Sequence, residues 1–392
     1  MMSTKSKREL VRTVSPRYVT AIGAEKARIL QEFVAITGYH RKYALALLNH
    51  PPLPRCRPIT RSRAKTYTPA VGRALVSLWQ VAGCICAKRL VPFLPDLVAA
   101  MECHNELVLE SETRHLLLTL SIATADRLLA EARRVHPPAR SLTKGGTVLR
   151  QHIPIRTFAD WEHVRPGFCE VDLVAHSGES GAGEFVHTLT LTDVVTGWTE
   201  CVAVTNKGEA AVREAIITAR AHLPFPLLGL DSDNGGEFIN HHLYRYCQRE
   251  EITFTRCRPY RKNDQCRVEQ KNGHIVRQLV GYERYEGREA CETLNALYAV
   301  AREVVNYFQP SVRLVGKARV GSRVKKTYDA AQTPYRRVLA AETVCREDKD
   351  RLRVAYAPLR PVALRRVLEE RQEAVWRGAV VRNTREATTR PK

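Results

Sequence analysis

The chain has 392 residues, of which 44% are hydrophobic and 26% are charged. This is too much apolar material for a disordered tail, and it is enough for two or three packed domains. No apolar run reaches the ~18 residues of a membrane span, because Ser77, Gln80 and Gly83 interrupt the longest candidate, 74–87. The basic N-terminus is followed by no apolar core, so we expect no secretory signal and a cytoplasmic protein.

Eleven cysteines are scattered along the chain. There is no CxxC pair, and only Cys84 and Cys86 form a CxC. Since a chain of this length can build a hydrophobic core without disulfide or metal cross-links, we expect reduced thiols rather than a disulfide or zinc framework.

The charge of the chain is large and unevenly distributed. With 62 Lys and Arg against 41 Asp and Glu, the net charge is +21, which indicates a polyanionic partner. Residues 1–165 carry 26 basic and 12 acidic side chains, 166–308 carry 15 and 20, and 309–392 carry 21 and 9. Two basic flanks bracket an acidic middle, as expected if the middle concentrates carboxylates to hold cations. A charge that merely aids solubility is the weaker interpretation.

Residues 1–50 are predicted to be a basic arm of about twenty residues followed by a helix-turn-helix. Apolar residues recur at helical spacing over 24–36 and 39–48, and Thr37 and Gly38 interrupt them. The second helix begins with His40, Arg41 and Lys42, where a recognition helix would meet DNA. Helical hairpins with a glycine turn also occur in proteins that bind no nucleic acid.

A Pro- and Arg-rich linker is expected over 51–68, and a second helical module that binds DNA over 69–135. This module closes with another helix-turn-helix pattern, 111–119 and 124–134, which offers Arg127 to DNA. A further linker follows over 136–165.

Residues 166–308 have the alternating strand and helix signals of an α/β domain. Three short β-branched runs predict an antiparallel meander, and later strands alternate with helices that begin near Glu209, Glu237 and Gln265. Such a pattern predicts a mixed sheet with helices on its faces. The remaining 309–392 are a basic region that binds DNA or a second protomer, with an amphipathic helix near 362–376.

Three carboxylates of the acidic middle lie where elements end. Asp172 is in the first strand, Asp233 follows the fourth, and Glu269 borders the apolar stripe of the helix from Gln265. Ligand sites of open sheets form beyond the carboxyl ends of strands. Three carboxylates in one crevice repel one another, and Mg²⁺ or Mn²⁺ with oxygen ligands is the usual compensation.

With 35 residues between Asp233 and Glu269, this set resembles the D,D-35-E pattern of retroviral-integrase-like transposases. The segments TGYHRKYA, CAKRLVPFLP, TLTDVVTGWTE and NYFQPS are similar to bacterial insertion-sequence DDE transposases. The resemblance implies an RNase H-like core in which Asp172, Asp233 and Glu269 are catalytic and hold two Mg²⁺ or Mn²⁺ ions. It further implies cleavage of double-stranded DNA at transposon ends, joining of the 3′-hydroxyl to target DNA, and a homo-oligomer on DNA.

Other polar residues of the middle have competing interpretations. Asp231 and Glu170 share strand faces with Asp233 and Asp172, and we interpret them as supporting or surface groups. His176 could touch the leaving group, although a lone histidine near a turn is more often structural. Trp198 is predicted to be core.

Basic residues near Glu269 are predicted to contact DNA. Lys271 and Arg277 flank its helix, and Gln265, Asn272 and Gly273 share its face and are expected to approach DNA. A preceding basic loop either contacts phosphate or is simply solvated; its residues are Arg256, Arg258, Arg261 and Lys262. Related integrases tend to carry lysines four and seven residues after the glutamate, where this chain has Gly273 and Val276. The N-terminal His/Cys cluster that binds zinc in retroviral integrases has no counterpart, so we predict no zinc.

Two alternatives remain open at this point. A transposase-derived DNA-binding regulator without catalysis would be expected to lack a carboxylate, whereas all three are present. A metal-dependent nuclease of the same fold would use the same residues to cut without joining. The long basic flanks favour the transposase, since end recognition and target capture need more DNA surface.

Overall fold

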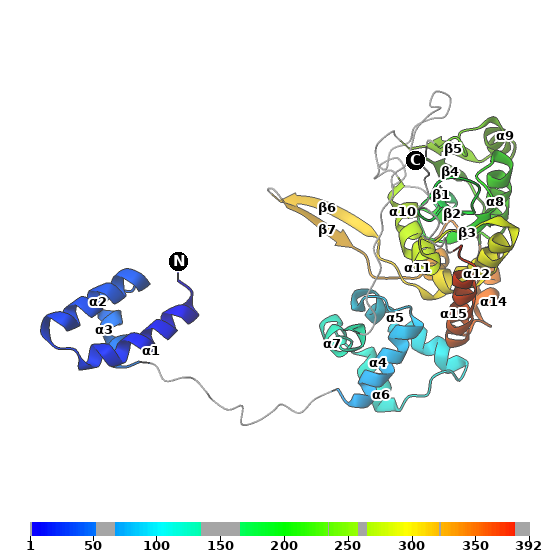
Figure 1. The fold of residues 1–392 in the computed structure, drawn as a ribbon. Helices are drawn as coiled ribbons and strands as arrows, with labels where there is room; N and C mark the ends of the chain where they lie inside the picture. The colour runs from blue at the N-terminus through cyan, green and yellow to red at the C-terminus, as the bar shows by residue number, and fades with distance from the viewer. Residues whose placement is uncertain are drawn as a thin grey trace, which may run out of the picture. The chain divides into compact units, whose positions relative to one another are not determined.

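The computed structural model describes residues 2–51, 67–134, 165–233, 235–257, 265–320 and 323–380. They belong to two compact units, 1–66 and 67–392 (Figure 1). The cysteines in these ranges are free thiols, as predicted. In the same ranges, no helix combines the length and the apolar character that crossing a membrane requires.

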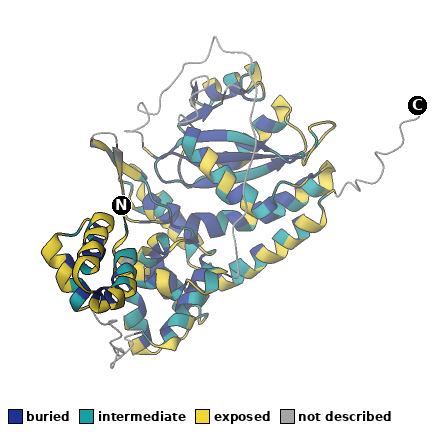
Figure 2. Cartoon of the chain, turned by 60° about the vertical axis from the view of Figure 1, so that its left-hand side comes forward, coloured by how far each residue is buried: buried dark blue, intermediate teal, exposed yellow. Residues whose placement is uncertain are grey.

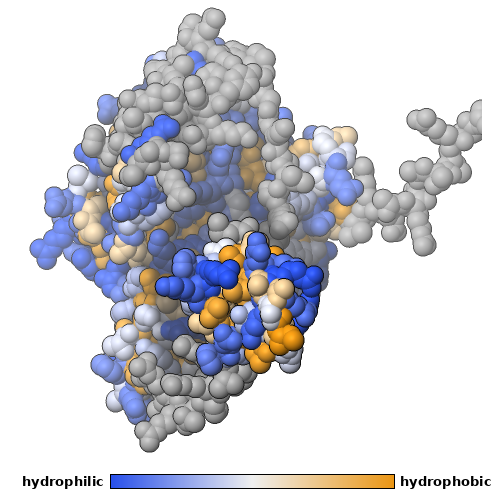
Figure 3. Space-filling view, turned by 90° about the vertical axis from the view of Figure 1, so that its left-hand side faces the viewer, coloured by the Kyte–Doolittle hydropathy of each residue, from blue (hydrophilic) through white to orange (hydrophobic). Residues whose placement is uncertain are grey.

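The first unit consists of three helices: α1 (Thr4–Thr20), α2 (Gly23–Thr37) and α3 (Arg41–Asn49). The prediction of an arm was wrong for α1, because Val11 and Tyr18 lie on one helical face and pack into the core of the unit. The two predicted helices after it are present, and Gly38, with φ of 68°, ends α2. Figure 3 shows hydrophobic side chains among hydrophilic ones on one face of the molecule. In this unit Ile22 and Ile36 are exposed.

The second helical block has four helices: α4 (Pro69–Val81), α5 (Ala87–Cys103), α6 (Ser111–Leu118) and α7 (Ile122–Leu128). Ser121 caps α7 by accepting the N–H of Thr124 at 3.2 Å. The helix is shorter than predicted, since 132–134 form a separate 3₁₀ turn. The apolar residues of this block share one core with Tyr307 and Tyr335, so it packs directly on the C-terminal half of the chain.

A five-stranded mixed sheet forms the centre of the second unit. Its strands are β1 (Phe168–Ala175), β2 (His187–Asp193), β3 (Thr199–Val204), β4 (Gly229–Ser232) and β5 (Thr253–Arg256). The order is β3-β2-β1-β4-β5, with β1 to β3 antiparallel and β4 and β5 parallel to β1. This confirms the predicted RNase H-like core, and Figure 2 shows its strands among the most deeply buried parts.

Helices cover both faces of this sheet. On one face, α8 (Glu209–Ala221) and α9 (His241–Arg249) pack against Cys169 and Val171 of β1. The predicted helix from Glu237 begins only at His241, because the side chain of Asn240 caps it by accepting the N–H of Leu243 at 2.8 Å.

The helix predicted from Gln265 is interrupted. It consists of α10 (Cys266–Lys271), a π-helical segment η4 (Asn272–Val276) and α11 (Arg277–Val280). The chain then enters the long helix α12 (Gly287–Phe308). Two asparagines of α12 bind the backbone of the edge strand β3: Asn295 pairs with Ala203 at 2.8 and 3.0 Å, and Asn306 pairs with Thr199 at 2.9 Å in both directions. The outward backbone groups of Thr199 and Ala203 are therefore satisfied without another strand.

The C-terminal region is a hairpin followed by three helices. The elements are β6 (Leu314–Val320), β7 (Arg323–Tyr328), α13 (Pro334–Ala340), α14 (Arg346–Tyr356) and α15 (Pro361–Arg377). The predicted amphipathic helix near 362–376 is α15, which buries Leu368 and Val375 in the core that α12 lines. Glu106, after α5, caps α15 by accepting two backbone N–H groups at 3.1 and 3.2 Å.

Candidate active site

Parallel pairing of β1 and β4 brings Asp172 and Asp233 together. Val171 lies opposite Ser232 in this register, so the two aspartates follow one residue further, where β4 ends. Because Val171 packs beneath α8 and α9, its neighbour Asp172 faces the other side of the sheet, where α10 lies. Two of the three predicted carboxylates therefore flank one crevice at the carboxyl end of a strand.

The turn after β4 places a fourth carboxylate nearby. Asp233 Oδ1 accepts the N–H of Gly235 at 2.8 Å. A Cβ on Gly235 would lie 2.9 Å from that oxygen and 2.7 Å from the carboxyl carbon of Glu237, so a larger residue would push these two acidic side chains aside. Sequence reasoning missed Glu237 because it assigned the residue to a helix; its position in the turn directly after Asp233 was the available signal.

Buried polar side chains attach α10, which carries Glu269, to the sheet. Glu170 is 2% exposed, and its Oε2 accepts the N–H groups of Arg267 at 3.0 Å and Val268 at 2.9 Å. The guanidinium of Arg267 lies 3.4 Å from Oε1. Gln265 Nε2 donates to the carbonyl of Asp231 at 3.2 Å. Glu170 is thus a supporting group that caps the helix of Glu269.

Asn272 connects this helix to Asp172. Its Nδ2 donates to Asp172 Oδ2 at 2.7 Å, and the other carboxylate oxygen accepts the N–H of Leu173 at 2.8 Å. Asn272 is the first residue of η4, three residues after Glu269. The sequence placed Asn272 and Gln265 toward DNA, whereas the structure turns both toward the sheet.

The acidic side chains perturb one another. Burial raises the pKa of Asp172 to about 7; the charge of Asp233 adds to the rise, the N–H of Leu173 opposes it, and Glu269 and Glu237 contribute further. Burial also raises the pKa of Asp233, partly offset by the Gly235 N–H and reinforced by Glu237. The three predicted carboxylates are therefore in electrostatic contact, and their full ionisation is unfavourable without a cation.

An oxygen-only donor set of this kind fits Mg²⁺ or Mn²⁺. Within the described ranges, however, no three His, Cys, Asp or Glu side chains are close enough to hold one ion. Glu269 lies on the exposed side of α10. The acidic groups would have to draw closer together to share an ion.

The rival residues near the crevice have structural roles. Asp231 is 3% exposed, and its Oδ1 accepts the hydroxyl of Thr255 at 2.6 Å. His176 is fully buried and lies 2.7 Å from the hydroxyl of Thr188; burial lowers its pKa to about 3, so it stays neutral. Trp198 is core, as predicted.

The two basic residues after Glu269 lie within the folded domain. Arg277 donates to the carbonyls of Ala175 at 3.0 Å and Gly281 at 3.2 Å. Burial lowers the pKa of Lys271 to about 8, and the groups that influence it further are Cys201, Arg89 and Arg337 rather than the carboxylates of the crevice.

The other predicted DNA contacts lie on helices or outside the described ranges. His40, Arg41 and Lys42 are exposed at the start of α3. Arg127 is exposed on α7, where it donates to the hydroxyl of Thr124 at 3.1 Å. Arg258, Arg261 and Lys262 lie outside the residues that the structure describes. The prediction was wrong for Arg256, which is the last residue of β5 and is buried rather than part of a solvated loop.

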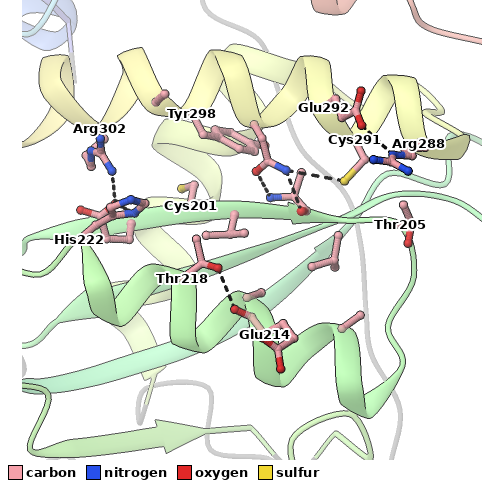
Figure 4. Close-up of a pocket in the computed structure, with 18 residues that line it drawn as sticks. Cys201, Thr205, Glu214, Thr218, His222, Arg288, Cys291, Glu292, Tyr298 and Arg302 are labelled. Atoms are coloured by element: carbon pink, nitrogen blue, oxygen red, sulfur yellow. Dashed lines mark hydrogen bonds and ion pairs between the residues drawn. The ribbon is translucent and has the colours of Figure 1, made fainter.

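An open pocket lies apart from this crevice. It has a volume of about 600 Å³ and lies between β3, α8 and α12 (Figure 4). At one end Glu200 lies 3.9 Å from Arg302 and 3.8 Å from His222, and burial raises the pKa of Glu200 to about 8. None of Asp172, Asp233 and Glu269 lines the pocket, so it is not part of the acidic site.

Residues 163–262 match a family model described as "Integrase core domain". The matched range contains Asp172 and Asp233 and ends before Glu269. Over 337 residues the chain is 47% identical to y4rM of Sinorhizobium fredii, which is described as an uncharacterized protein; the match covers 86% of this chain and 96% of that one.

Similar solved structures include two viral integrase domains. The catalytic core domain of BIV integrase is 20% identical, with 43% of this chain and 91% of that chain covered and a TM-score of 0.30. The HTLV-2 integrase catalytic core domain in complex with magnesium is 17% identical, with 38% and 92% covered and a TM-score of 0.29.

Proposed function

We propose that this chain, a DDE transposase- or integrase-like protein whose residues 163–262 match the integrase core domain, is an active DDE transposase. It binds transposon ends, cleaves the DNA to expose a 3′-hydroxyl, and joins that hydroxyl to target DNA. The integrase core supports a polynucleotidyl transferase-like function in general. The joining of the 3′-hydroxyl to target DNA is more specific than this, and it is what we propose.

The acidic crevice where β4 ends beside β1 is the observation that carries this proposal. Asp172, Asp233 and Glu269 come from two strands and one helix, and the charges of Asp233 and Glu269 raise the pKa of Asp172, which burial has already raised, to about 7. Carboxylates that are costly to ionise together and are nevertheless held in one place are characteristic of a site built for cations.

Asp172, Asp233 and Glu269 would hold two Mg²⁺ or Mn²⁺ ions. When bound, such ions neutralise charge at the reacting phosphate and activate the attacking water or 3′-hydroxyl. The protein itself supplies orientation: Asn272 fixes the carboxylate of Asp172, and Glu170 fixes the helix of Glu269. No nucleophilic side chain is needed, because the attacking group comes from water or DNA.

Double-stranded DNA is the proposed partner, in agreement with the net charge of +21. The exposed residues His40, Arg41 and Lys42 of the first unit are proposed to read the transposon end, with Arg127 contacting DNA from the second helical block. Since two ends must be joined, the active form is proposed to be a homo-oligomer, working in the cytoplasm.

A strand-joining assay tests the proposal. A labelled, pre-cut DNA end from the sequence flanking the gene is incubated with a plasmid and Mg²⁺ or Mn²⁺. We expect wild-type protein to join the two and Glu269→Gln to reduce joining to at most about one hundredth. Glu289→Gln, at an exposed position in the first turn of α12, is the matched control and should join normally.

The outcomes separate the alternatives. Cutting of an uncut end without joining by the wild type would favour a nuclease of the same fold. Tight binding of the end with neither cutting nor joining, with either metal, would favour a DNA-binding regulator. Equal joining by wild type and Glu269→Gln would remove Glu269 from the site.

A further inference from the structure

The β6–β7 hairpin is basic on both of its faces. Residues 314–328 contain five Lys or Arg and no Asp or Glu. Lys325 pairs with Ala318 and Lys326 with position 317 in the antiparallel register. Because successive residues of a strand face opposite sides, the exposed Lys325 and Lys326 lie on opposite faces. Neither lysine has a carboxylate neighbour within the hairpin.

The base of the hairpin is held firmly by the folded body. Ser311 and Gln332 pair through their backbones at 2.9 and 3.1 Å. Asp329, the first acidic residue after the hairpin, accepts the backbone N–H of Arg313 and the guanidinium of the buried Arg337 of α13, each at 2.6 Å. The nearest acidic charge is thus used at the base, while the positive charge lies on the part that projects (Figure 1).

The base lies within electrostatic range of the helix that carries Glu269. Burial lowers the pKa of Arg313, and the positive charges of Arg337 and Arg267 lower it further. Arg267 is the residue of α10 that binds Glu170. DNA lying in the acidic crevice would therefore come close to the start of the hairpin.

We propose that the β6–β7 hairpin is a DNA-binding ribbon that lies in a groove of double-stranded DNA, with Lys325 and Lys326 neutralising phosphates. The proposal rests on the proposed function in that DNA is the substrate. A two-stranded ribbon fits the major groove, which is about 12 Å wide. Two-stranded hairpins are only marginally stable alone, and a polyanion that binds both lysines would stabilise this one.

A second copy of the chain is a less suitable occupant. Pairing of two such hairpins edge to edge would bring rows of Lys and Arg together, and charged edge strands are a known protection against that pairing. The exposed Val315 and Tyr328 could contact another protein, but they lie near the base, away from the lysine pair. Charge complementarity therefore favours DNA.

The test measures DNA affinity of the full chain as a function of salt. Fluorescence anisotropy gives the dissociation constant for a labelled 30-base-pair duplex between about 50 and 200 mM NaCl. For Lys325→Ala/Lys326→Ala, two lost phosphate contacts should make the slope of log affinity against log salt shallower by about 1.8. Arg249→Ala/Arg288→Ala removes two exposed charges from α9 and α12, outside the regions proposed to bind DNA, and should keep the wild-type slope.

A hairpin variant with the slope of the control would overturn the proposal. So would loss of self-association in light scattering without any change in slope, which would make the hairpin a protein interface. Thermal melting must show equal stability for both variants, as expected for exposed positions. If the wild type joins DNA but the hairpin variant keeps the wild-type salt slope, only the DNA-binding ribbon is rejected. If the hairpin variant has a shallower salt slope but the wild type joins no DNA, only the transposase proposal is rejected.

Discussion

Replacing Glu170 with alanine should loosen the helix of Glu269 and weaken the use of divalent metal. Glu170 is almost fully buried, and it accepts two backbone N–H groups at the start of α10 as well as lying against the guanidinium of Arg267. Removing it takes away the carboxylate that accepts both N–H groups. The start of α10 then loses the cap that Glu170 provides.

The expected size of the effect follows from these contacts. Loss of an N-terminal cap costs about 1 kcal/mol, and loss of a hydrogen bond to a charged group about 1.5–3 kcal/mol. Burial raises the pKa of Glu170 in spite of its bonds, so desolvation already offsets part of this gain. We expect the free energy of unfolding to fall by about 2–3 kcal/mol for Glu170→Ala and about 1 kcal/mol for Glu170→Gln, whose amide oxygen still accepts one N–H.

Two measurements check this prediction. Urea denaturation gives the free energy of unfolding, and a Mg²⁺ titration of strand joining gives the half-saturating concentration, which should rise about tenfold for Glu170→Ala. Glu179→Ala, at an exposed position, is the control. If stability falls while the half-saturating Mg²⁺ concentration stays at the wild-type value, Glu170 supports only the fold. Unchanged stability would show that its bonds contribute nothing.

Three further predictions concern the acidic crevice. The pKa of Asp172 is raised from 3.8 to about 7, so the metal-free native state holds an extra proton between these pH values, and its free energy of unfolding should fall as pH rises from about 4 to 7. Urea titrations in EDTA should show this fall for the wild type. The Asp172→Asn variant should lack the part of the fall that Asp172 causes. Asn272→Ala leaves Asp172 Oδ2 without its amide donor and should lower joining about tenfold at unchanged thermal stability, whereas a drop in melting temperature alone would assign Asn272 to the fold. Gly235→Ala should weaken Mg²⁺ binding, measured by calorimetry, because the added Cβ meets two carboxylates; Gly236→Ala, which meets nothing within 4 Å, should bind normally, and equal affinities would contradict the crowding argument.

The positions of Asp172 and Asp233 could be predicted because strand signals are local. The β-branched run of β1 and the turn after β4 fix where each strand lies, and period-two alternation fixes which face Asp172 takes. The carboxyl end of β4 then follows from the rule for open sheets. These inferences need no knowledge of which strands pair.

Side-chain directions around Glu269 could not be predicted in the same way. An uninterrupted helix advances about 100° per residue, and the sequence reasoning placed Asn272 and Gln265 on that basis. The π-helical segment η4 begins at Asn272 and changes the phase from there, while Gln265 precedes the helix with non-helical dihedral angles. Both side chains consequently bind the sheet, and a helical wheel cannot show this.

The N-terminal helix α1 was missed for a different reason. It is mostly polar, contains Pro16, and buries only a narrow stripe that includes Val11 and Tyr18. Such a helix is marginal alone and gains its stability from packing against α2 and α3, so its local pattern resembles that of a basic arm.

The geometry of the crevice depends on how its helix is attached to the sheet. The helical run 266–280 contains a π-helical segment and is only as long as a helix that is marginal alone, so its position is set by tertiary contacts. Glu170 holds the start of α10 and Asn272, at the end of α10, holds Asp172. A shift of α10 would therefore move Glu269 and the donor to Asp172 together. The positions of Asp172 and Glu269 are thus coupled through α10. Their ability to approach a shared cation depends on the buried hydrogen bonds of Glu170 and Asn272 as much as on their own charges.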